Sequence, residues 1–277
     1  MRKSVLSILL GMAVDRGLVD LDQSLASLDF DDLGGLTGAE KEATIRMLMQ
    51  SRSGVYHPAA YEMQSQKSLR PARGSHAPGT FWYYNNWDFN ALGAIYKLRT
   101  GRTVFEALRD DLARPLQFED LDLTRDTRFL FQPGSLHPAY ALKMSARDLA
   151  RVGLLMARSG RWGEKQLVSS RWVTQSTTPA SVVHAGRHGY AYMWWVPRSA
   201  WAFWTRSEGD VFLAWGNYGQ FLLVDQARDL VVVHQADWRR FAPNAGADEV
   251  IGPLLKEILA AYPHREPPSA ATRGAIR

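Results

Sequence analysis

A cysteine nucleophile is excluded at the outset, because the 277 residues contain no cysteine. The sequence also has no Gly-x-Ser-x-Gly elbow, no His-Glu-x-x-His zinc motif and no phosphate-binding loop. Its seven histidines lack the spacing of metal ligands, so we interpret each as structural or exposed. The residue types therefore predict no metal and no cofactor, and they do not favour a Ser-His-Asp triad.

Five segments, spread over nearly the whole chain, form a pattern together. They are Thr44–Val55 (Thr-Ile-Arg-Met-Leu-Met-Gln-Ser-Arg-Ser-Gly-Val), Pro78–Gly93 with Tyr84-Asn85-Asn86 after a Pro-Gly pair, Met144–Arg151, Gly160–Trp162, and Gly219-Gln220 with Asp229–Val233. In this order they resemble the serine β-lactamase-related hydrolases, which include class C β-lactamases, D-peptidases, penicillin-binding proteins, esterases and 6-aminohexanoate-dimer hydrolases. Any one of these segments would be weak evidence for the family, whereas five segments in the family's order are specific evidence for it.

The resemblance makes Lys3 part of a catalytic site. In this family the nucleophilic serine lies in Ser-x-x-Lys at the start of a helix, so that the lysine amine is one turn from the hydroxyl and accepts its proton. Counting back from Lys3 places that serine directly before Met1, and the sequence has no other Ser-x-x-Lys. We therefore expect that the sequence starts inside a longer reading frame or comes from a truncated gene. The chain as written would then lack the usual N-terminal strands and be inactive.

Tyr84 and Asn86 receive roles from the same resemblance. Tyr84 would share the proton relay with Lys3, activating the serine and then protonating the leaving group. Asn86 would hydrogen-bond the substrate or hold Lys3. A purely structural interpretation is that Tyr84 and Asn86 cap the next helix and that Lys3 is an exposed basic residue. The hydrolase interpretation requires the side chains of Lys3 and Tyr84 to lie together.

The third family motif departs from its pattern. Where β-lactamases and D-peptidases carry Lys-Thr-Gly on the strand beside the site, the best match here is Ala214-Trp215-Gly216. The cation that would meet a substrate carboxylate is missing, which argues against penicillin-like or D-alanyl substrates and favours a small-molecule ester or amide. The resemblance implies that Trp215 forms an apolar wall of the substrate site. The alternative is a core residue, since a tryptophan on a strand is more often in the core. The backbone N–H of Asn217 would donate to the oxyanion.

The first helical segment, Met1–Val14, has two possible interpretations. A basic start, an apolar run and Gly11-Met12-Ala13 as a cleavage site are typical of an export signal. Alternatively, the segment is a buried helix ended by Gly17 in the left-handed conformation. The family resemblance favours the buried helix, and the cellular location stays open.

Helices are predicted where capping boxes precede apolar residues at helical spacing, namely at Thr37–Glu40, Thr103–Glu106 and Ser145–Asp148. The first is expected to open a helix that continues through Met49. Residues 55–80 are expected to form a long surface loop. A helix is also predicted from Tyr84-Asn85-Asn86 to Gly101, so residues up to about Ser176 are mostly helical.

The character of the sequence changes after Pro179. An antiparallel meander is predicted from the runs Tyr190–Val196, Trp201–Thr205, Val211–Trp215, Gln220–Val224 and Leu230–His234, followed by a helix over Asp248–Tyr262. The predicted fold class is α+β and β-lactamase/transpeptidase-like. We expect a mainly helical region over residues 1–178, the sheet and C-terminal helix over 179–262, and a disordered tail over 263–277.

The amino-acid composition limits the classes of partner that we expect for this chain. Lys and Arg exceed Asp and Glu by 33 − 28 = 5, but the basic residues are scattered, so we expect no nucleic acid. No apolar run reaches the ~18 residues of a membrane span. The oligomeric state stays open. The alternative function is a non-catalytic binding or regulatory relative of the same fold, for which the missing serine and the missing Lys-Thr-Gly cation would be the evidence.

Overall fold

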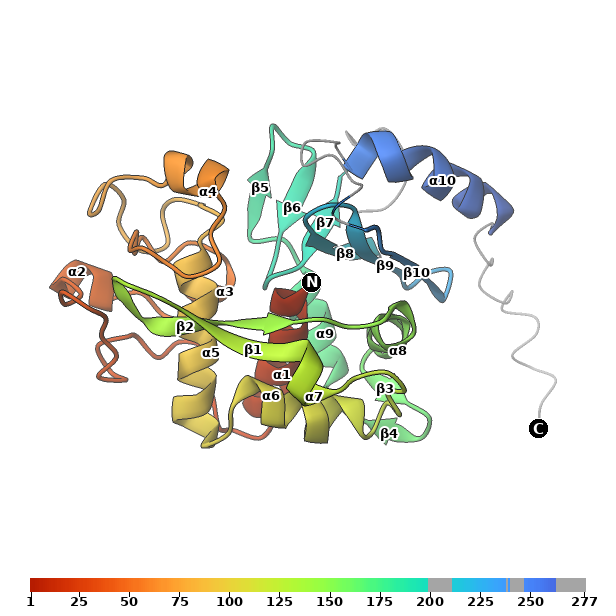
Figure 1. Cartoon of the computed structure of the whole chain (residues 1–277), viewed down its shortest axis with the longest axis horizontal. Helices are drawn as coiled ribbons and strands as arrows, with labels where there is room; N and C mark the ends of the chain where they lie inside the picture. Colours follow the sequence, from red (N-terminus) through yellow and green to blue (C-terminus); the bar gives the residue numbers. More distant parts are fainter. Residues whose placement is uncertain (199–210, 238, 240–246, 263–277) are drawn as a thin grey trace, which may run out of the picture.

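The fold combines a mainly helical part with a six-stranded antiparallel sheet, and the N-terminus lies between them (Figure 1). The structure is a computed structural model that describes residues 1–198, 211–237, 239 and 247–262. Its helices are α1 (Arg2–Asp15), α2 (Gly38–Lys41), α3 (Ile45–Met49), α4 (Gln64–Leu69), α5 (Asn86–Thr100), α6 (Val104–Ala107), the π-helix η1 (Leu108–Ala113), α7 (Leu123–Asp126), α8 (Ala146–Ala157), α9 (Ser170–Thr177) and α10 (Ala247–Ala261).

The strands form one large sheet and two hairpins. They are β1 (Thr127–Gln132), β2 (Ser135–Leu142), β3 (Arg161–Trp162), β4 (Lys165–Gln166), β5 (Ser181–Val183), β6 (His188–Tyr190), β7 (Trp195–Pro197), β8 (Val211–Gly216), β9 (Gln220–Asp225) and β10 (Leu230–His234). The large sheet is antiparallel and has the order β10-β9-β8-β7-β6-β5. Its strands β8, β9 and β10 are runs predicted for the meander, whereas β5 was not predicted. Helix α8 packs on β9 and β10 through Gly153, where a Cβ atom would lie only 2.4 Å from Val231 Cγ1. The predicted α+β class is confirmed.

Helix α1 lies at the centre of the helical part and is buried continuously from Ser4 to Ala13. Gly11 allows α9 to approach, since a Cβ atom there would lie 2.2 Å from Trp172 Nε1. Gly17, with a φ of 70°, ends the helix by donating its N–H to the Val14 carbonyl at 2.9 Å, and Leu18 donates to the Ala13 carbonyl at 2.9 Å. These two bonds form a Schellman motif. The first segment therefore has the buried-helix form, and Gly17 ends it as predicted.

Two predicted elements are wrong because the chain turns inside them. The helix expected from Thr37 to Met49 is divided into α2 and α3, since the Thr44 side chain accepts a hydrogen bond from Met47 N–H and begins a new helix. The strand expected over Tyr190–Val196 is a hairpin, in which Tyr190 of β6 pairs with Trp195 of β7. Met193 lies in the turn with a φ of 62°. The strand expected at 201–205 and the tail at 263–277 lie outside the described residues.

The region predicted to be mainly helical also contains two hairpins, β1–β2 and β3–β4. The β1–β2 hairpin packs on α5, where Gly93 makes room for the Tyr140 ring; a Cβ atom at Gly93 would lie 2.9 Å from it. The expected loop over residues 55–80 contains the short helix α4. The β1–β2 hairpin depends on its packing against the distant α5, which local sequence patterns do not contain.

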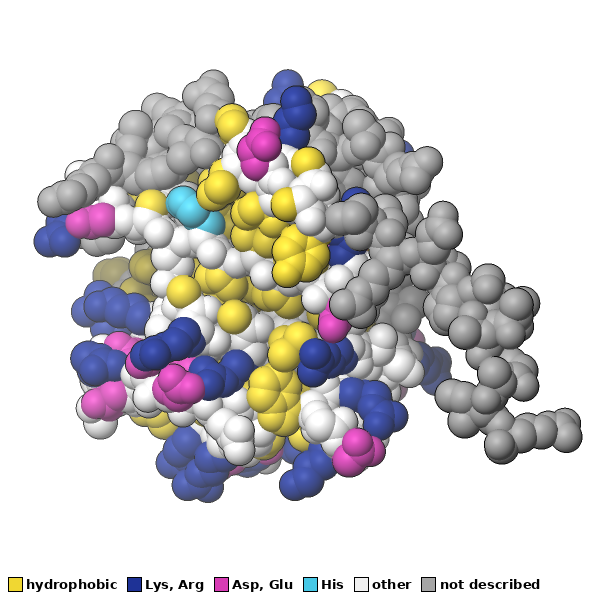
Figure 2. Space-filling model, turned by 90° about the vertical axis from the view of Figure 1, so that its right-hand side faces the viewer, with side chains coloured by type: hydrophobic (Ala, Val, Ile, Leu, Met, Phe, Trp, Pro, Cys, Tyr) yellow, Lys and Arg dark blue, Asp and Glu magenta, His cyan; other side chains and the backbone are white. Residues whose placement is uncertain are grey.

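Charged side chains of both signs are mixed on the surface. On the face in Figure 2, Lys and Arg side chains lie among Asp and Glu side chains. Several are paired, such as Arg147 with Asp120 at 2.9 Å. Within the described residues, no helix is long and apolar enough to cross a membrane.

Candidate active site

The side chains of Lys3 and Tyr84 meet although 81 positions separate them in the chain. Lys3 Nζ donates a hydrogen bond of 2.7 Å to Tyr84 Oη. The same nitrogen lies 4.0 Å from the centroid of the Tyr84 ring and 4.3 Å from that of Phe89. The N-terminus lies where the helical part meets the sheet (Figure 1). The structure thus satisfies the condition that the hydrolase interpretation imposes.

The first turn of α1 is anchored on both sides of Lys3. Ser4 Oγ donates a 2.7 Å hydrogen bond to the carbonyl of Met193, in the turn between β6 and β7. Arg2 Nη2 donates a 3.3 Å bond to Asn90 Oδ1 of α5, and its guanidinium lies 4.4 Å from the Tyr140 ring centroid. The sheet and the helical part therefore both fix the backbone that carries Lys3.

Tyr84 is held at the start of α5 by a buried polar network. Asn85 is the N-cap of α5, and its side chain accepts from Trp87 N–H. Its amide donates to the Val55 carbonyl at 2.6 Å and to Asp88 Oδ1 at 2.9 Å. Ser53 Oγ donates to the same Asp88 oxygen at 2.5 Å. These bonds tie the turn that carries Tyr84 to the segment after α3.

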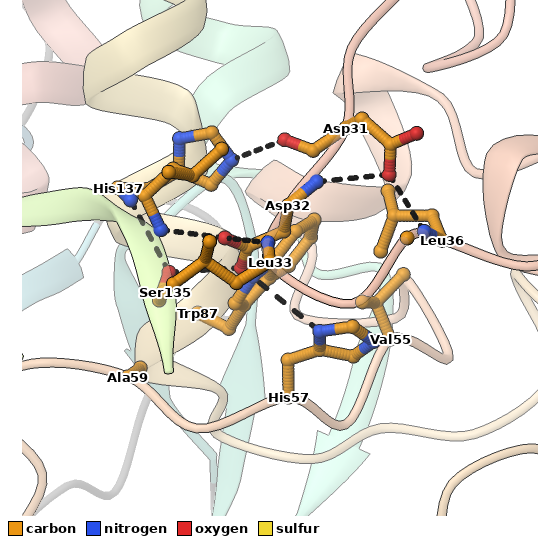
Figure 3. Close-up of polar contacts among 12 residues, drawn as sticks. Asp31, Asp32, Leu33, Leu36, Val55, His57, Ala59, Trp87, Ser135 and His137 are labelled. Carbon is orange, nitrogen blue, oxygen red and sulfur yellow. Dashed lines mark hydrogen bonds and ion pairs between the residues drawn. The ribbon is translucent and has the colours of Figure 1, made fainter. Parts of the chain in front are cut away.

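A second buried acidic side chain, Asp32, bonds Trp87 in the first turn of α5 (Figure 3). Asp32 accepts hydrogen bonds from Trp87 Nε1 at 2.6 Å, from Ser135 Oγ at 2.8 Å and from Leu136 N–H at 2.6 Å. His57 Nδ1 lies 3.9 Å from the same carboxylate. The sequence analysis missed Asp32, because it lies in an acidic, glycine-containing stretch that is typical of an ordinary turn.

The electrostatics of the pair favour proton transfer. Burial lowers the pKa of the Lys3 amine well below its usual value, and the Arg2 charge lowers it further. Burial raises the pKa of the Tyr84 phenol above its usual value, and the Arg2 charge opposes this rise. Both shifts favour the neutral forms. They give an amine that can accept a proton and a phenol that can donate one.

Asn86 lies next to the pair in sequence but bonds elsewhere. Its amide nitrogen donates to Gln66 Oε1 at 2.8 Å and to the Tyr61 carbonyl at 3.3 Å, both in the segment around α4. Asn86 Oδ1 is buried and has no hydrogen-bond partner among the described residues. The structure therefore does not place the Asn86 amide on Lys3, and a role in substrate binding stays a prediction.

Trp215, Gly216 and Asn217 lie at the end of β8, on the sheet side of the site. The Trp215 ring centroid is 5.5 Å from that of Trp195, which is in turn 5.5 Å from that of Tyr84. Trp215 is half-buried, so part of its ring is available to a ligand. The Asn217 amide nitrogen contacts Met63 Sδ at 3.0 Å. The Trp195 ring therefore lies between the third motif and the Lys3–Tyr84 pair and contacts both Trp215 and Tyr84.

Comparison with known proteins identifies the family and the fold. The Beta-lactamase family model matches residues 1–249. A penicillin-binding protein from Bacillus halodurans is 16% identical over 93% of this chain and 84% of its own, with a TM-score of 0.61. A β-lactamase from Mycobacterium bovis is 20% identical over 94% and 84%, with a TM-score of 0.59. A family VIII carboxylesterase is 14% identical over 92% and 81%, with a TM-score of 0.60. No curated protein matches. The predicted β-lactamase/transpeptidase-like fold is confirmed.

Proposed function

Because this chain belongs to the Beta-lactamase family, we propose that it is a serine hydrolase that acts on an ester or amide through an acyl-enzyme. The observation that carries the proposal is the 2.7 Å hydrogen bond between Lys3 Nζ and Tyr84 Oη. A polar pair of this kind, held between two buried helices, has the chemistry that a serine hydroxyl needs to become a nucleophile.

The nucleophile is a serine three residues before Lys3, one position ahead of Met1. In the first step its hydroxyl proton passes to the Lys3 amine while Oγ bonds to the substrate carbonyl carbon. The bond to the leaving group then breaks, and the Lys3–Tyr84 pair returns the proton to the departing oxygen or nitrogen. A water molecule repeats the sequence and releases the acid. Since no Ser-x-x-Lys occurs within the 277 residues, we expect them to be inactive by themselves.

The substrate side of the site supports an uncharged ester or amide. The third motif, Ala214-Trp215-Gly216, has no cation where a carboxylate would bind. Trp215, which is half-buried, offers an aromatic side chain instead. The Asn217 backbone N–H serves as an oxyanion donor, which would stabilise the transition state by roughly 3 kcal/mol, and Asn86 would orient the substrate.

A fluorophosphonate probe, which labels activated serines, tests the proposal. The chain extended by one serine before Met1 should be labelled at that serine. The matched chain extended by alanine, and the 277-residue chain, should not be labelled. Absence of labelling in a folded serine-extended chain would contradict the hydrolase proposal and favour the non-catalytic binding or regulatory relative.

A further inference from the structure

Aromatic rings surround Trp195 beside the Lys3–Tyr84 pair. The Trp195 ring centroid lies 5.5 Å from that of Tyr84, 5.2 Å from His184, 5.5 Å from Trp215 and 6.1 Å from Trp82. The rings come from four separate segments: the segment before α5, the β5–β6 turn, β7 and β8. Tyr84, whose phenol oxygen accepts the hydrogen bond from Lys3, contacts Trp195 directly, so the cluster adjoins the Lys3–Tyr84 pair.

The rings differ in exposure in a way that suits a binding surface. Trp195 is buried, with 7% of its surface exposed. Trp82 and Trp215 are half-buried, and His184 is exposed. His184 also contacts both of them, with centroids 5.9 Å from Trp82 and 6.5 Å from Trp215 at nearly perpendicular planes. Three partly exposed rings therefore surround a buried one, next to the proposed reacting centre.

The chemistry of these rings favours flat aromatic groups. Aromatic pairs prefer edge-to-face or offset contacts, which add to the gain from burying apolar area. A flexible alkyl chain would bury area here but would not make the ring–ring contacts.

We propose that Trp82, His184 and Trp215, packed around Trp195, form a subsite for a flat aromatic group of the substrate. This inference rests on the proposed function, because it assigns the substrate class of the same site. It extends the wall formed by Trp215 to the segment before α5 and to the β5–β6 turn.

Ligand binding to the 277-residue chain tests the subsite without any need for catalysis. The probes are N-(2-naphthyl)acetamide, followed by its own fluorescence, and N-propylacetamide, measured by its competition with the first. The naphthyl amide should bind at least about tenfold more tightly, a preference that aromatic contacts and burial can supply. Equal affinities of the two amides would overturn the proposal.

Three variants locate the effect. Trp82→Leu and His184→Ala should each reduce the preference for the naphthyl amide several-fold. Trp162→Leu, which removes a half-buried tryptophan on β3, should leave it unchanged. His184→Ala alters an exposed turn residue, so it keeps the test valid if Trp82→Leu fails to fold. A naphthyl preference that survives both subsite variants, or that Trp162→Leu also abolishes, would overturn the assignment.

The two proposals can fail separately. If fluorophosphonate does not label the serine-extended chain but the naphthyl preference depends on Trp82 and His184, the aromatic subsite stands and the serine chemistry is wrong. If labelling occurs and neither subsite variant changes the naphthyl preference, the hydrolase stands and the subsite is wrong.

Discussion

The two sides of the candidate site are held by different means. Lys3 lies in α1, and Tyr84 directly precedes Asn85, the N-cap of α5; both helices are mostly buried and are joined in the interior by a hydrogen bond from Arg2 to Asn90. Asn86 and Asn217 instead bond to Gln66 and Met63, in and next to α4, a helix that buries none of its residues. Segments with few buried contacts open more easily than a core. We infer that the proton-transfer side is rigid and that the substrate side can adapt.

The largest effect is expected from removing the phenol hydroxyl of Tyr84, on the proton-transfer side of the site. In the serine-extended chain, Tyr84→Phe should lower kcat/KM by roughly 10²–10⁴, as expected for loss of a general acid–base group. The ring packing is preserved but the buried Lys3 amine loses its acceptor, so the free energy of unfolding should fall by only about 1–3 kcal/mol. Steady-state kinetics and thermal unfolding provide the two measurements. A fully active Tyr84→Phe enzyme would exclude the proposed relay.

The packing difference between α1 and α4 should appear in stability. Gly11→Ala puts a methyl group where Trp172 packs against α1, and it should lower the free energy of unfolding by about 1–3 kcal/mol. The control Ser65→Ala, on the exposed α4, should change it by less than about 0.5 kcal/mol. Urea denaturation measures both. Equal effects at the two positions would contradict the contrast between the two regions.

The pH dependence of stability tests the buried amine. The folded state lowers the pKa of Lys3 below its ordinary value of 10.5, so between these two pKa values the unfolded chain binds a proton that the folded chain lacks. In that window the free energy of unfolding rises with pH, by up to about 1.4 kcal/mol per pH unit. Lys3→Met should remove this part of the slope. Identical slopes for the two chains between pH 7 and 9.5 would show that Lys3 is not buried as described.

Local features of the fold could be predicted from the sequence because a few neighbouring residues determine them. Gly17 ends α1, the capping box at Thr103 begins α6, and Ser145 caps α8, each through bonds that span three to five residues. The five family segments predicted the fold and directed attention to Lys3 and Tyr84. Asp32 was missed, because its role depends on donors that are 55 to 104 positions away.

The sequence by itself determined the caps that begin α6 and α8, the strands β8, β9 and β10, and the residue types available for proton transfer. Only the tertiary structure decided that Tyr190 and Trp195 pair across a hairpin and that Asn86 bonds Gln66 rather than Lys3. It also decided which aromatic rings pack around Trp195. The reason is physical: caps and periodicity act within a few residues, whereas partners across the chain are chosen by how buried surfaces pack.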